Sequence, residues 1–249
     1  MAGDATGSTA RAPQRRRIRS TPYDRHMPFT GFGSEAIEFY VGLEADNSKA
    51  WFQAHKAIYD ECVKGSFEAL AQDVADTFKP MRLFRPNRDV RFSTDKSPYK
   101  TAAAAMSESE GGAIYYVQLS AQGLMAATGY YAMATDQLQR FRDAIADERT
   151  GPELAAITEA LTRSGYDLGA VGELKTAPRG FAKDHERISL LRRKGLVAGR
   201  SWAPAAWMHT RKALGRIEDA WHGADAMNAW LDHNVGPSEL PPDEGGRGR

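Results

Sequence analysis

The sequence predicts an α+β fold, in which a small antiparallel sheet of about four strands packs with N-terminal and C-terminal helices. Two observations carry this prediction. Apolar residues recur at helical spacing before residue 80 and after residue 135, whereas the segment between them alternates apolar and polar residues as half-buried strands do. No internal repeat of the kind found in solenoid proteins is present. The order of helices, then strands, then helices is typical of α+β proteins.

The two ends of the chain differ in composition from its centre. Residues 1–26 are rich in Ala, Gly, Ser, Thr, Pro and Arg, which predicts a disordered basic tail. The ordered pattern begins at Met27, and translation starting there is a hypothesis. Residues 236–249 are rich in Pro and Gly and predict a second disordered tail. We therefore expect a single globular domain over residues 27–235.

Three helices are expected before any strand. Ser34 stands at the N-cap position of the first helix, which is followed by apolar residues spaced by three and four. Asp46 or Asn47 is expected to cap the second helix, and Gly65 to kink or end it. The same period continues over residues 67–78, which predicts a third amphipathic helix.

The middle of the chain predicts the sheet. Residues 81–84 and 90–93 alternate as strands do, with Pro86-Asn87 as the turn between them. Residues 113–120 and 124–131 are rich in Tyr, Val and Ile and predict an antiparallel hairpin.

Helical periodicity then returns for the rest of the predicted domain. The expected helices occupy residues 135–146, 152–162, 184–194 and 204–231.

Composition limits the function. The net charge of +1 and the isoelectric point near 7.9 disfavour a general nucleic-acid binder, which needs many cations over a wide face. Cys62 is the single cysteine, which excludes an intramolecular disulfide and a cysteine-rich zinc site and fits a reducing cytoplasm. No run approaches the roughly 18 apolar residues of a membrane span. We therefore expect a cytoplasmic protein without a membrane partner.

Positive charge is concentrated between Arg82 and Thr101, where interleaved apolar residues indicate a folded segment. Cations on strands can share one face, and guanidinium forks with lysine charges suit phosphate or carboxylate groups. A second basic segment, residues 175–194, contains Pro178 and Gly180 in a loop that can complete such a site. The predicted anion-binding residues are Arg88, Arg91, Lys96, Tyr99, Lys100 and Arg179.

Two alternatives to a ligand site stay open. The same cations can form an internal ion-pair network with Asp89 and Asp95, in which case the chain is a structural or protein-interaction module. RNA or DNA binding through this segment and the arginine-rich tail is a third, less favoured reading. The sequence does not indicate an oligomeric state.

No catalytic motif is recognised, so enzymatic activity is left open. His55 and His185 are the acid or base candidates, but His55 lies beside Trp51 and Tyr59 on an apolar helix face, which favours a core role. The histidines lack metal-ligand spacing, and no phosphate-cradling loop, dinucleotide fingerprint or nucleophile elbow occurs. We therefore predict no metal site and no cofactor.

A set of short motifs runs along the chain. It comprises Phe29-Thr30-Gly31-Phe32, Trp51-Phe52, His55-Lys56, Asn87-Arg88-Asp89-Val90-Arg91-Phe92, Asp95-Lys96-Ser97-Pro98-Tyr99-Lys100-Thr101 and Pro178-Arg179-Gly180. Over residues 28–233 this set resembles an uncharacterised, largely bacterial family, catalogued as domain of unknown function 2461. The resemblance implies no established activity, cofactor or substrate. The residues themselves favour a cytoplasmic domain that binds a small phosphorylated or carboxylated ligand.

Overall fold

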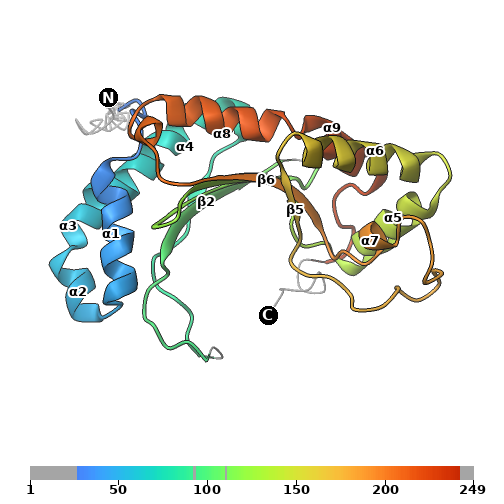
Figure 1. The fold of residues 1–249 in the computed structure, drawn as a ribbon, viewed down its shortest axis with the longest axis horizontal. Coiled ribbons are helices and arrows are strands. Elements are labelled where there is room, and N and C mark those ends of the chain that lie inside the picture. Colours follow the sequence, from blue (N-terminus) through green and yellow to red (C-terminus); the bar gives the residue numbers. More distant parts are fainter. Residues whose placement is uncertain (1–26, 92–93, 110, 242–249) are drawn as a thin grey trace, which may run out of the picture.

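The structure is a computed structural model, and it describes residues 27–91, 94–109 and 111–241. One antiparallel sheet of six strands, in the order β1-β2-β3-β4-β6-β5, runs through the molecule. Helices lie along one face of this sheet, and no helix covers the opposite face of its central strands (Figure 1). The helices at the two ends of the molecule extend past that opposite face, which gives the molecule the shape of an arch. The predicted α+β class is confirmed.

The strands differ from the prediction in number and position. They are β1 (Arg82–Leu83), β2 (Ala102–Glu108), β3 (Ile114–Ser120), β4 (Gly123–Tyr130), β5 (Asp167–Gly169) and β6 (Leu196–Trp202). The hairpin β3–β4 is confirmed, with Val117 opposite Ala126. The sheet has six strands instead of about four, because β2, β5 and β6 were not predicted and one predicted strand is absent from the described residues.

The predicted strand over residues 90–93 is wrong for its described part. Val90 and Arg91 lie in a loop, and residues 92–93 are outside the described residues. The strand that pairs with β1 and β3 is instead the alanine-rich β2. Alanine has low strand propensity, so local preference does not explain β2. Hydrogen bonds to β1 on one side and to β3 on the other stabilise this strand.

The N-terminal helices form a nearly continuous run. They are α1 (Ser34–Ala45), α2 (Lys49–Ala54), α3 (Lys56–Ile58), the π-helical η1 (Tyr59–Lys64) and α4 (Gly65–Phe78). The cap of α2 is Ser48, whose Oγ accepts a hydrogen bond from the Trp51 amide at 3.1 Å. The prediction of Asp46 or Asn47 as this cap is therefore wrong. Gly65 does not end the helix, because the chain passes there from π-helical to α-helical geometry.

The remaining helices follow the hairpin. They are α5 (Thr135–Ala146), α6 (Thr150–Arg163), α7 (Ile188–Leu191), the 3-10 helix η2 (Ala206–His209), α8 (Lys212–His222) and α9 (Asp225–Asn234). The predicted helix over 135–146 agrees with α5 at both ends. The predicted helix over 184–194 is reduced to one turn, and that over 204–231 is broken into three pieces.

Two buried clusters of apolar side chains lie between the helices and the sheet. One contains Phe67 and Trp221 and joins α1, α4 and α8 to β2, β3 and β4. The other contains Phe141 and Trp230 and joins α5, α6 and α9 to β4 and β6. Burial of these clusters supplies the main driving force for folding. None of the described helices combines the length and apolar character needed to cross a membrane.

Residues beyond 235, the expected end of the domain, contact α5. The carbonyls of Gly236 and Pro237 accept hydrogen bonds from side chains of α5, and Asp136 of that helix accepts hydrogen bonds from Ser238 and Glu239. The ordered part therefore continues past residue 235. The predicted N-terminal tail, residues 1–26, is outside the described residues, as are residues 242–249.

Candidate functional site

The predicted basic segment is a long loop between β1 and β2, described over residues 84–91 and 94–101, which projects below the sheet edge (Figure 1). Its two arms pair with each other. The Arg88 amide donates to the Pro98 carbonyl at 2.9 Å, and the Lys100 amide donates to the Pro86 carbonyl at 2.8 Å. The loop is therefore built as an extension of a hairpin, and its base has a defined conformation.

The N-terminal helices hold this loop through Asn47. The Asn47 side chain donates to the Tyr99 carbonyl and accepts from the Tyr99 amide, both at 3.1 Å. The Tyr99 ring stacks on Phe52 with centroids 3.9 Å apart and is 5% exposed. Tyr99, a predicted ligand contact, is therefore a core anchor that fixes the loop.

A cavity of about 810 Å³ lies on the sheet face that carries no helix. Its walls come from the loop and from strands β2, β3, β4 and β6. The lining residues are Phe84, Arg88, Lys100, Thr101, Ala102, Ala104, Met106, Ile114, Tyr116, Gln118, Met125, Ala127, Tyr131 and Val197. Two of these are cationic and none is acidic, so the cavity favours a negatively charged guest.

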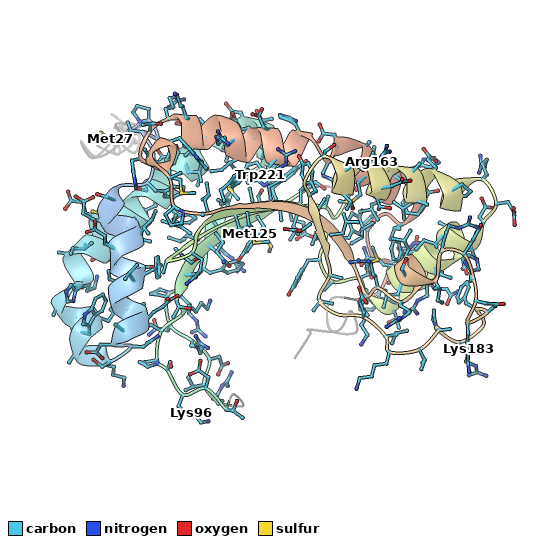
Figure 2. The ribbon with its side chains drawn as sticks, in the orientation of Figure 1. Met27, Lys96, Met125, Arg163, Lys183 and Trp221 are labelled. Carbon is cyan, nitrogen blue, oxygen red and sulfur yellow. The ribbon has the colours of Figure 1, made fainter. Side chains whose placement is uncertain are left out.

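The alternation of side chains along the strands explains this lining. Ala103 and Ala105 are buried in the core beneath the helices, whereas Ala104 and Met106 line the cavity. Register places Ala104 beside Gln118, which in turn pairs with Met125. Figure 2 shows the Met125 side chain on the open side of the sheet. The cavity floor is therefore a cross-strand set of small and apolar side chains.

Lys100 is the more unusual of the two cavity cations. Its Nζ lies 5.4 Å from the centre of the Phe84 ring, and within the described residues it pairs with no carboxylate. Burial lowers the pKa of the Lys100 ammonium, and the nearby Arg85 and Arg88 lower it further. The charged form of Lys100 is therefore less favourable in the folded protein than in water.

Arg88 is paired with a carboxylate, but its hydrogen bonding is incomplete. Its Nη1 forms an ion pair with Asp95, while its Nε is buried and has no hydrogen-bond partner among the described residues. Hydrogen bonds from Ser97 lower the pKa of the Asp95 carboxyl, and the charge of Arg88 adds to this effect. One N–H of Arg88 thus has no acceptor among the described residues, since guanidinium groups offer five N–H donors.

Two further predicted cations have local partners and do not line the cavity. Arg91 donates to both carboxylate oxygens of Asp89, at 3.0 and 2.7 Å, and its side chain is 75% exposed. These bonds lower the pKa of the Asp89 carboxyl to about 2. The Lys96 Nζ donates to the Val90 carbonyl at 2.9 Å, far out on the loop in Figure 2.

Arg179 is not brought to the other predicted residues. It is exposed in the loop between β5 and α7, and Figure 2 shows Lys183 of this loop at the opposite end of the molecule from Lys96. The two basic segments therefore do not form one site. His185 belongs to the same distant loop, where its Nδ1 accepts a hydrogen bond from the Arg187 amide at 3.0 Å.

His55 has a structural role. Its ring stacks on Trp51 with centroids 3.9 Å apart, and its Nδ1 lies 2.8 Å from the Trp51 carbonyl oxygen. It does not line the cavity. Within the described part of the chain, no group of three or more His, Cys, Asp or Glu residues is placed to hold a metal ion.

The sequence prediction missed the apolar part of the site. Met106, Tyr116 and Met125 line the cavity but were assigned no function. The alternation in β3 and β4 was visible, but which face lacks covering helices depends on the path of the whole chain.

Comparison with known proteins gives a family and no activity. None of the curated proteins compared with the chain matches it. A family profile described as "Conserved hypothetical protein (DUF2461)" matches residues 35–230, which include the loop, the cavity strands and most of the helices above them. With most of its length matched, the chain belongs to this DUF2461 family.

Proposed function

We propose that the protein binds a small phosphorylated or carboxylated ligand in the cavity on the open sheet face, with Arg88 and Lys100 contacting the anionic group. Two features support this function. The cationic groups stand together at the loop side of the cavity, and no acidic residue lines it. Charge-assisted hydrogen bonds from such groups to an oxyanion are among the stronger polar contacts in proteins.

Lys100 is the observation that carries the proposal. A partly buried ammonium beside two arginines raises the free energy of the empty protein, because burial and like charges both disfavour its charged form. A bound anion removes this penalty. Groups whose ionisation is perturbed in a cleft are enriched at functional sites.

The test is a thermal-shift screen with inorganic phosphate, phenyl phosphate and benzoate on the wild type, Lys100→Met and Lys96→Met. A ligand at about 100 times its Kd stabilises the folded state by about 2.7 kcal/mol, which raises the Tm of a chain of this size by about 5–10 °C. We expect this shift in the wild type and in Lys96→Met, and its loss in Lys100→Met. Equal shifts in all three proteins would contradict the proposed site.

A structural role for the loop is the second candidate, and the pairs Arg91–Asp89 and Arg88–Asp95 favour it. Such exposed pairs contribute little to stability, because water and salt screen the attraction. Asp95→Asn and Lys100→Met together separate the two candidates in the empty protein. A structural network implies a lower Tm for Asp95→Asn, which loses the ion pair with Arg88. A ligand site implies an unchanged or higher Tm for Lys100→Met, which removes an unfavourably placed charge.

Nucleic acid is disfavoured because its phosphates need cations along the whole surface. The floor of the cavity is apolar, and its cations are confined to residues of one loop. The proposal places the protein in the cytoplasm, since one cysteine supports no internal disulfide.

A further inference from the structure

The cavity is asymmetric along the sheet. Arg88 and Lys100 enter it from the loop beside β2, whereas Val197 lines it from β6. In the strand order, β3 and β4 lie between β2 and β6. Neighbouring strands are about 4.8 Å apart, so the cavity floor extends about 14 Å from β2 to β6. A ligand anchored at the cations therefore has room to extend across the sheet.

The surface beyond the cations is apolar. Tyr116 and Gln118, from the centre of the floor, are already bonded to each other, because the Tyr116 hydroxyl donates to the Gln118 side-chain oxygen at 2.7 Å. The residues around them include Met106, Ile114 and Met125. Contact between such a surface and a hydrocarbon group is favourable, because it removes apolar surface from water. A sugar or a second charged group would lose its hydration there without gaining hydrogen bonds.

Small side chains give the cavity its depth. Ala104 and Ala127 line the floor, and both are buried or nearly so. Larger residues at these two positions would fill the space, since both side chains point to the open face. The depth allows a guest to lie in contact with the floor instead of across its rim.

We propose that the ligand is an amphiphilic anion, in which one carboxylate or phosphate group is joined to an unbranched alkyl or a flat aryl body. The anionic group contacts Arg88 and Lys100, and the body lies over β3 and β4. The charge at one end of the cavity and the apolar floor beyond it favour this occupant over an inorganic anion. This inference rests on the proposed anion site and adds the chemical class of what binds there.

The first test uses isothermal titration calorimetry on the full chain with acetate, butyrate, hexanoate and octanoate, each below its micellar concentration. Burial of a methylene group tightens binding by about three- to fourfold. We expect the Kd to fall roughly a hundredfold from butyrate to octanoate. Octyl phosphate is titrated in parallel, and comparison of its Kd with that of octanoate shows whether the site prefers a phosphate or a carboxylate group. Either preference supports an amphiphilic anion as the ligand.

The second test blocks the floor and leaves the charges in place. Ala127→Leu fills the cavity over β4, away from the loop, and Ala50→Leu, at an exposed position of α2, is the matched control. We expect Ala127→Leu to weaken octanoate binding at least about tenfold more than it weakens the binding of inorganic phosphate. Circular dichroism checks that the variant is folded, and Ala104→Leu, on β2, gives a second block.

The outcomes separate this inference from the proposed function. If phosphate or acetate binds through Lys100 and the Kd is independent of chain length, the anion site stands and the amphiphile is overturned. If octanol binds as tightly as octanoate, the role of the cations is overturned and the apolar cavity stands. If none of these compounds binds the wild type, both ideas fail.

Discussion

Asn47 is expected to control the position of the basic loop, and Asn47→Ala tests this directly. The side chain makes two hydrogen bonds to the backbone of Tyr99, and these join the turn before α2 to the arm that ends in Lys100. Each such bond contributes about 0.5–1.5 kcal/mol net, so their loss should lower the free energy of unfolding by about 1–3 kcal/mol.

The measurement is urea unfolding followed by circular dichroism. We expect a lower midpoint with an unchanged slope, because the variant changes stability and not the surface exposed on unfolding. Hydrogen exchange at the Tyr99 amide should also become faster, since that amide loses its acceptor. Ligand binding should weaken as well, because the loop that presents Arg88 and Lys100 loses an anchor.

Asn87→Ala is the matched control. Asn87 lies on the opposite arm of the loop, where its backbone forms a bridge with Tyr99 and its side chain is exposed. A surface change of this kind is expected to cost about 0.5 kcal/mol or less. If the two alanine variants have equal midpoints, the anchoring role of Asn47 is refuted.

Three further predictions concern other parts of the molecule. The pKa of Lys100 is lowered in the folded protein, so the unfolded chain binds more protons between the lowered pKa and the ordinary 10.5. The free energy of unfolding should therefore rise with pH over that interval, and Lys100→Met should abolish this rise in urea titrations. Bonds from residues 238 and 239 lower the pKa of the Asp136 carboxyl to about 2, so they stabilise the docked segment above pH 3.8. The protection factor of the Glu239 amide, which corrects for the intrinsic pH dependence of exchange, should fall as pH falls from 3.8 to about 2, and that of Asp136→Asn should stay constant over that range. Gly31 has φ +117°, and a Cβ there would lie 2.3 Å from the Thr210 amide nitrogen, so Gly31→Ala should lower the free energy of unfolding by about 2 kcal/mol or more. A variant with wild-type stability would show that this contact relaxes without cost.

The elements that the sequence predicted well are those with a strong local pattern. Helix α5 begins and ends where the periodicity of residues 135–146 placed it, because its buried Phe141 and Ile145 are spaced by four residues on one face. The β3–β4 hairpin was equally clear from its β-branched and aromatic residues around Gly123, which has φ +113°.

The predictions that were wrong concern elements whose conformation depends on partners far along the chain. Strand β2 consists largely of alanine, and it is a strand because β1 and β3 supply hydrogen bonds on both sides. Asn47 was predicted to cap a helix, yet its partner is Tyr99, 52 residues away. No local pattern signals such a bond.

Part of the candidate site was likewise predictable from the sequence, and part depended on the tertiary structure. The sequence located the basic segment, although as strands, and proposed Arg88 and Lys100, which line the cavity, because their charge stands out in a nearly balanced chain. It could not show that Arg91 forms an ion pair with Asp89, or that the loop containing Arg179 and Lys183 lies far from Lys96, since both facts depend on where the chain passes.

The sequence by itself determined the α+β class, helices such as α5 and the position of the cationic segment, because periodicity and charge are local properties. Tertiary structure decided which sheet face stays free of helices and which cations meet there. The physical reason is that side chains alternate across a strand, so the exposed face is chosen by how every other element packs. The apolar cavity beside Lys100 is a product of that packing.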